Sequence, residues 1–177
     1  MPENNFPVPD FREIHKLLMR DVFVIAERES VAFFKESFDK GGFTDESFKA
    51  WDNRNEPDYR PGGKLMVATR YLYDSIEVAE KDRTSITIGS YAPYAEIHNE
   101  GGTLKIPITP QSRKFFWYMY KKTENPKWKT LALTKQTHIT TTMQQRQFMG
   151  PSAKMMEQMD DQLKAQILHR FKNLKTI

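Results

Sequence analysis

The chain has 177 residues, a formal net charge of +4, 38% hydrophobic and 12% aromatic residues, and no cysteine. Its length suits one domain with an elaboration, in which about two thirds of the unfolded surface can be buried without help from a metal or a disulfide. The absence of cysteine excludes a disulfide framework, a thiolate zinc site and a thiol nucleophile.

Residues 1–10 are polar and contain prolines, and this composition predicts a loose N-terminal arm. They lack the basic start and the apolar run of a secretion signal. The longest nearly apolar run in the chain, residues 22–26, is far too short to cross a bilayer. We therefore expect neither secretion nor insertion into a membrane.

A long helix is predicted after this arm. Asp10 can cap its start at Phe11, and Glu13 lies three residues beyond Asp10, as in a capping box. Apolar residues recur at helical spacing as far as Phe38, and two glycines at residues 41–42 end the pattern. The apolar face is wider than one stripe, which indicates that the helix lies between a sheet and a further element.

A short helix and a β-hairpin are predicted after a loop at residues 43–63, which is rich in asparagine, proline and glycine. Apolar residues between Leu65 and Ile76 fit the short helix. Two short β-type runs follow at residues 76–79 and 85–88, and the charged residues between them are typical of a hairpin turn.

The second half of the chain is predicted to contain strands and two helices. Residues 104–108 alternate around a proline, which favours an edge strand. A helix then begins at Pro110 or Ser112, and Pro126 closes it. The remaining predictions are strands at residues 130–134 and 138–143, and a final helix after Pro151 and Ser152 whose row Met155, Met156 and Met159 packs on the sheet.

Two motifs carry the most information about function, YAPYAEIHNEGG at residues 91–102 and RQFMG at residues 146–150. In the first motif, adjacent glycines let the backbone turn sharply or approach another chain closely. Its two tyrosines offer a large contact area at low entropic cost. In the second motif, Arg146 can clamp backbone carbonyls or a partner carboxylate with its rigid guanidinium, or remain a plain exposed arginine. We interpret these motifs as contact surfaces.

A basic, aromatic segment lies between the two motifs. Residues 111–135 contain seven lysines or arginines and the single acid Glu124, a local charge of +6. Aromatic residues such as Phe115, Trp117 and Trp128 are interleaved with these cations. This pattern fits a subunit interface, where aromatic residues are enriched, and it also fits stacking platforms and phosphate contacts for nucleic acid. Because the segment lacks a recognised nucleic-acid motif, we favour the interface.

Catalytic and metal-binding interpretations have less support in the sequence. Glu96, His98 and Glu100 alternate, so on a strand they would share one face, but a third firm ligand at fixed spacing is missing. The chain also lacks a G-x-S-x-G elbow and a glycine motif that cradles phosphates. We therefore expect a protein that is not an enzyme, with no catalytic residue, no cofactor and no metal site.

Three stretches agree in order and spacing with a known family: LMVATRYLYDSIEV at residues 65–78, SITIGSYAPYAEIHNEGG at residues 85–102 and MQQRQFMGPS at residues 143–152. They resemble the phage virion morphogenesis family, the tail completion proteins of Mu-like and P2-like phages. Gln144 and Gln145 stand where the family has a proline before the arginine. Residues 107–122 also resemble a related siphophage tail-component family, in which a similar insertion forms a projecting arm.

The resemblance implies an α+β fold, in which a long N-terminal helix and a C-terminal helix pack on a small antiparallel sheet. It implies one domain over residues 1–177, with residues 1–10 as the loose arm and residues 103–142 as an inserted projecting segment. The implied function is tail completion or head-tail joining, through self-assembly into a ring and docking onto phage tail and connector proteins. The implied location is the virion, and the host cytoplasm during assembly.

An alternative function is binding of DNA without sequence preference through residues 111–135. On the preferred interpretation, aromatic side chains of the two motifs and of the inserted projecting segment are buried against neighbouring molecules. The expected interface residues are Tyr91, Tyr94, His98, Asn99, Gly101, Gly102, Phe115, Trp117, Arg146, Phe148 and Gly150.

Overall fold

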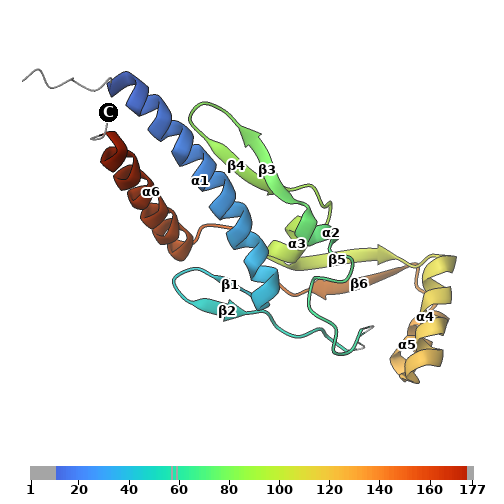
Figure 1. Ribbon diagram of the computed structural model, residues 1–177. Helices are drawn as coiled ribbons and strands as arrows, with labels where there is room; N and C mark the ends of the chain where they lie inside the picture. Colours follow the sequence, from blue (N-terminus) through green and yellow to red (C-terminus); the bar gives the residue numbers. More distant parts are fainter. Residues whose placement is uncertain (1–10, 57, 59, 175–177) are drawn as a thin grey trace, which may run out of the picture.

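Figure 1 shows the computed structural model, which describes residues 11–56, 58 and 60–174. Two long helices and two strand pairs form the body, and an arm projects from it. This combination of helices and antiparallel strands confirms the α+β prediction. In chain order the elements are α1 (Phe11–Lys40), β1 (Gly42–Thr44), β2 (Phe48–Ala50), α2 (Tyr71–Asp74), β3 (Ile76–Lys81), β4 (Ile86–Ser90), α3 (Ala95–Glu100), β5 (Gly102–Pro107), α4 (Pro110–Thr123), α5 (Pro126–Leu133), β6 (His138–Met143) and α6 (Ala153–Leu174).

The described strands form three separate antiparallel pairs instead of the single small sheet that the family resemblance implies. β1 pairs with β2, β3 with β4, and β5 with β6. A two-stranded ribbon is marginal in water by itself, so each pair depends on packing against a helix or another surface. The first two pairs pack on α1, whereas the third leaves the body as part of the arm.

Helix α1 is the central element of the body. It begins at Phe11 and ends at Lys40, as predicted, and the positive φ of Gly41 (70°) redirects the chain there. The proposed cap, Asp10, lies outside the described residues. In Figure 1, α1 lies between α6 on one side and the β3–β4 hairpin on the other. This arrangement accounts for its wide apolar face.

The main hydrophobic core forms around the C-terminal half of α1. The Phe38 side chain is fully buried, and its ring lies 5.6 Å from Trp51 and 5.0 Å from Phe148, measured between centroids. Aromatic pairs in such geometries stabilise a core beyond the area that they bury. The buried core residues are Phe33, Phe34, Phe38, Phe43, Trp51, Leu72, Ile76, Ala92 and Phe148.

Helix α6 packs mainly on α1, whereas the sequence predicted that its methionine row packs on the sheet. Asp21 of α1 accepts hydrogen bonds from Arg170 and Gln166 of α6, and the bond from Arg170 is the main reason that the pKa of Asp21 is lowered. In the predicted methionine row, Met159 is buried but Met156 is exposed. The two helices therefore meet along a mixed apolar and charged seam.

Two predictions for the segment between α1 and β3 are corrected. The predicted loop at residues 43–63 contains the β1–β2 hairpin, whose strands are too short to show alternation and are held by packing of Phe43 on Phe33. The helix predicted from Leu65 to Ile76 is reduced to the single turn α2. Met66 and Arg70 have positive φ angles of 58° and 62°, which a right-handed helix does not tolerate.

A third correction concerns residues 130–134, which were expected to form a strand but belong to α5 and its C-terminal cap. The Asn125 side chain accepts a hydrogen bond from the Lys127 backbone N–H, and Pro126 occupies the first turn, where proline is favoured. Pro126 therefore begins α5 instead of closing α4, which already ends at Thr123 and is followed by its cap Glu124 with a positive φ of 55°.

The segment predicted as an insertion, residues 103–142, consists of β5, β6 and the helical pair α4 and α5 at the outer end of the ribbon. The strands pair from Gly102 opposite Met143 to Pro107 opposite His138. Directly opposed residues share a face, so Ile106 and Ile139 lie on one apolar face of the ribbon. We call this segment the arm, and residues 110–135 at its end the arm tip.

Candidate functional site

The two sequence motifs meet at one place in the body, which we call the motif junction. Helix α3 presents Asn99, whose side-chain oxygen accepts hydrogen bonds from the backbone N–H groups of Phe148 (2.9 Å) and Met149 (3.0 Å). The Arg146 backbone N–H donates to the His98 carbonyl at 2.8 Å. These hydrogen bonds join the segment before β5 to the segment after β6, although the two are almost fifty residues apart. The joined segments form the root of the arm.

The close approach at the junction requires glycine at position 101. Gly101 has a φ of 73°, and a Cβ atom there would lie 2.9 Å from the Gln145 nitrogen and 3.1 Å from the Met143 oxygen. Both neighbours are backbone atoms and cannot move aside easily. Gly102 and Gly150 also have positive φ angles, of 138° and 148°. The glycines in the two motifs therefore serve the path of the chain itself.

Arg146 occupies the centre of the junction and is only 7% exposed. Its guanidinium donates to the Asp52 carbonyl at 3.2 and 3.0 Å, to the Asn53 carbonyl at 3.1 Å, and to the Gln144 side chain at 2.9 Å. Burial and the nearby charge of Arg54 lower the pKa of Arg146. The guanidinium thus clamps backbone carbonyls, which is one of the roles suggested by the sequence.

Phe148 lies inside the chain, 1% exposed, within the aromatic core. The interpretation from sequence has it buried against a neighbouring molecule, but its own chain already covers it. Sequence reasoning also missed Trp51, whose indole N–H donates to the Gln147 carbonyl at 2.7 Å. The only signal for this contact is a lone tryptophan in a polar stretch, because its partner is 96 residues away.

The three possible metal ligands of the first motif do not all share a face, because His98 points away from Glu96 and Glu100. Glu96, His98 and Glu100 lie on helix α3, where residues two apart point in nearly opposite directions, and not on a strand. Within the described residues, no group of three or more histidine, cysteine or acidic side chains is placed to hold a metal ion. His98 instead contacts Tyr94, with ring centroids 5.7 Å apart.

Acidification is expected to destabilise the fold through His98. Its pKa is lowered in the folded chain, first by burial and then by the charge of Arg146, and its Nδ1 atom is buried without a described partner. The unfolded chain, with a histidine pKa of 6.5, therefore binds the proton more readily. The contribution of neutral His98 to the free energy of unfolding is therefore fully present above pH 6.5, the pKa of the unfolded chain. It is lost as the pH falls toward the lower pKa of His98 in the folded chain.

Urea unfolding followed from about pH 7.5 to about pH 5 measures this effect, because the histidine titrates in that range. The variant His98→Gln cannot titrate, so its stability is expected to fall less over the same range. Equal pH dependence in the variant and the original chain would show that His98 does not contribute.

The tyrosines of the first motif form an exposed cluster with a third tyrosine. Tyr71 lies 5.6 Å from Tyr91 and 6.1 Å from Tyr94, between ring centroids, and Tyr91 is 54% exposed. We call these three residues the tyrosine cluster. Tyr71 belongs to a stretch matched by the family resemblance, but its spacing from Tyr91 gives no sign of the contact. The cluster is a surface that the chain itself does not cover.

The arm tip carries a second exposed aromatic surface. On its inner side, Phe116 stacks on Trp128 with a centroid distance of 6.0 Å, and Met119 is buried between the helices. On its outer side, Trp117 is 36% exposed and Tyr118 is 59% exposed. Phe115 is also exposed. The small inner core orders the two helices, and the remaining aromatic side chains face solvent among lysines.

A groove of about 930 Å³ lies between the arm and the body. The apolar face of the ribbon forms one wall, and the turn around Met66 belongs to the body wall. Tyr94 and His98 line it from the body, and Phe115 and Trp128 line it from the arm tip. The groove therefore connects the motif junction, the tyrosine cluster and the arm tip.

The chain matches no protein-family profile, no curated protein and no solved structure. Within the described part of the chain, no helix has the length and apolar character needed to cross a membrane. Of the predicted interface residues, Tyr91, Tyr94, Phe115 and Trp117 are exposed, whereas Arg146 and Phe148 are internal. The two motifs thus combine an internal clamp with an external aromatic surface.

Proposed function

We propose that this chain is a structural protein of phage or prophage virion morphogenesis, a tail completion or head-tail neck component. It acts by self-assembly and by docking onto tail and connector proteins, and not as an enzyme. The observation that carries the proposal is the arm, which holds exposed aromatic and basic side chains away from the body. Exposed apolar patches on a projecting element are typical of surfaces that another protein covers.

The internal clamp supports this proposal because it fixes the arm at its root. Asn99 and Arg146 join the segments that precede β5 and follow β6, so the direction of the arm is set by the body. A rigidly held contact element loses less entropy when it docks than a loose one. The tyrosine cluster provides a further exposed aromatic surface, which is available for docking onto another protein.

A second candidate function is binding of DNA without sequence preference. Lys121 and Lys122 lie in the last turn of α4, close in sequence to the exposed rings of Trp117 and Tyr118. Such a combination can contact phosphates and stack on bases. Salt titration of duplex binding by the purified chain separates the candidates, because tight binding with a steep salt dependence favours this second function.

The proposed function is tested by deleting the gene for this chain from a prophage whose host strain releases phage particles. Electron microscopy of the lysate is expected to show unjoined heads and tails, and supply of the intact gene from a plasmid is expected to restore joined particles. Normal particles from the deletion strain would contradict the proposal. Mass spectrometry of purified particles then shows whether the chain remains in the virion.

A further inference from the structure

The charge of the chain is divided unevenly between the arm tip and the rest. The complete chain has a formal charge of +4, while residues 111–135 alone carry +6, so all other residues together carry −2. The tip is therefore a basic element attached to a mildly acidic body. Opposite charge on two parts of one molecule permits attraction between copies.

Several acidic residues of the body line two neighbouring hollows. The first, of about 550 Å³, lies between α1 and α6 and is lined by Glu29, Glu36 and Asp161. The second, of about 560 Å³, lies at the β1–β2 hairpin and includes Asp45 and Glu46. Phe33 lines the first hollow and Phe43 lines the second. The centroids of their rings are 6.2 Å apart.

The segments around these hollows have a substantial negative charge. Residues 27–36 carry a formal charge of −1, and residues 42–52 and 153–162 carry −2 each, which gives −5 for the three segments together. We call this region the acidic face. Its charge is close in size and opposite in sign to the +6 of the arm tip.

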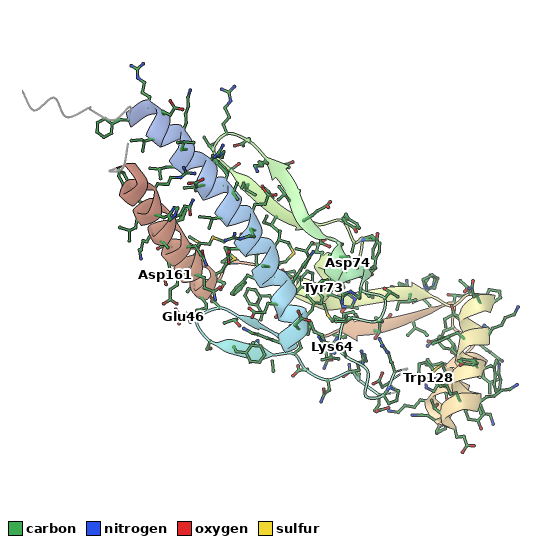
Figure 2. All side chains as sticks on the ribbon, in the orientation of Figure 1. Glu46, Lys64, Tyr73, Asp74, Trp128 and Asp161 are labelled. Carbon is green, nitrogen blue, oxygen red and sulfur yellow. The ribbon has the colours of Figure 1, made fainter. Side chains whose placement is uncertain are left out.

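The acidic face and the arm tip lie far apart, on opposite sides of α1. In Figure 2, Glu46 and Asp161 lie on one side of α1, and Trp128 lies at the far end of the arm on the other side. The two surfaces therefore do not meet within one molecule. In a second copy placed head to tail, they can meet without any change in the fold.

The ion pairs already present on the acidic face do not prevent such a contact. Glu36 pairs with Lys40 at 3.0 Å, and Asp161 pairs with Lys164 at 3.6 Å, in both cases between exposed side chains one helical turn apart. Exposed pairs of this kind contribute little stability, so their carboxylates can exchange a local cation for one from a partner.

We propose that the arm tip of one copy docks on the acidic face of the next copy. The inference deepens the proposed function, on which it rests, by assigning the two surfaces of self-assembly. Lys121 and Lys122 supply the charge, and the exposed rings of Trp117 and Tyr118 supply apolar area next to them. Because the two surfaces differ, the contact is heterologous and repeats into a ring or a filament.

A charge swap tests the contact in the full chain. The tip variant combines Lys121→Glu with Lys122→Glu, and the face variant combines Glu46→Lys with Asp161→Lys, all at exposed positions. Sedimentation velocity at low ionic strength is expected to show association of the original chain that weakens with added salt. Each variant alone is expected to associate at least about tenfold more weakly, because the charge of the tip falls from +6 to +2 or that of the acidic face from −5 to −1. An equimolar mixture of the two is expected to recover association.

The matched control combines Lys16→Glu with Arg83→Glu, which changes the net charge as the tip variant does but lies away from both surfaces. It is expected to associate like the original chain. Unchanged thermal unfolding of all variants shows that they fold. Recovery in the mixture cannot come from a folding defect, so this result supports the contact directly.

Three results would overturn the inference: an original chain that stays monomeric at low ionic strength, a tip variant that associates normally, or a mixture that does not recover. If the tip variant associates normally but no longer binds duplex DNA, the tip is a nucleic-acid surface. The particle experiment is independent of these measurements. Normal particles from the deletion strain refute the proposed function, whereas failure of the charge swap refutes only the assignment of surfaces.

Discussion

The substitution Phe148→Ala is expected to lower the free energy of unfolding by about 3–5 kcal/mol, as for other large aromatic residues removed from a core. Phe148 is 1% exposed, and its ring lies against Phe38. Its backbone N–H is also fixed by Asn99, so the surrounding structure has little freedom to close the cavity. Urea unfolding followed by circular dichroism measures the change.

The variant Trp117→Ala serves as the control for this prediction. Trp117 lies on the arm tip, is 36% exposed and is distant from the core around Phe38, so its removal is expected to cost less than about 1 kcal/mol of stability. A Phe148→Ala variant that is as stable as the original chain but fails to assemble would contradict the internal role. It would instead support the contact with a neighbour that the motif suggests by itself.

The substitution Arg146→Ala is expected to lower the free energy of unfolding by roughly 1.5–3 kcal/mol, because it removes the charge-assisted hydrogen bonds of a buried guanidinium to part-buried acceptors. The carbonyls of Asp52 and Asn53 both lose their hydrogen bonds from the guanidinium. The direction of the arm depends on the same residue, because Arg146 lies in the short segment that follows β6. Guanidinium chloride unfolding, with urea as a check, measures the loss.

Two further variants separate the shape of this side chain from its charge. Arg146→Lys keeps the charge, but the lysine ammonium group lacks the planar set of N–H donors that bonds both carbonyls. Most of the loss in free energy of unfolding is therefore expected to remain. Gln144→Ala removes one side-chain acceptor and leaves the backbone contacts, so a loss of about 1 kcal/mol is expected. Full stability of Arg146→Lys would mean that charge alone is required.

Several elements of the fold were predictable because their signals are local. Helix α1 has a long apolar periodicity and ends at Gly41, and the β3–β4 hairpin combines alternation with a polar turn. The helices predicted near Pro110 and after Ser152 form where caps and prolines favour their first turns. In each case, neighbouring residues contain the information that sets the conformation.

The missed elements depend on contacts that are distant in sequence. The β1–β2 hairpin has strands of three residues and is held by packing of Phe43 on α1. The predicted helix at residues 65–76 fails because Met66 and Arg70 adopt left-handed conformations. Such conformations are uncommon for these residue types and have no signature in the sequence.

The candidate site shows the same division. The sequence identified both motifs as important and the arm tip as basic and aromatic, because these properties belong to composition and spacing. It could not distinguish Tyr91, which faces solvent, from Phe148, which lies in the core. The role of Arg146 as a clamp also depended on carbonyls more than ninety residues earlier in the chain.

The sequence by itself determined the helical and strand periodicities, the positions of the glycine turns and the excess of positive charge in residues 111–135. The tertiary structure alone decided that the two motifs join at the root of the arm, and that the basic tip and the acidic face lie on opposite sides of α1. The reason is physical. Local conformation depends on neighbouring residues. Whether a side chain is buried or exposed depends instead on segments that are distant in sequence and come close only when the whole chain packs.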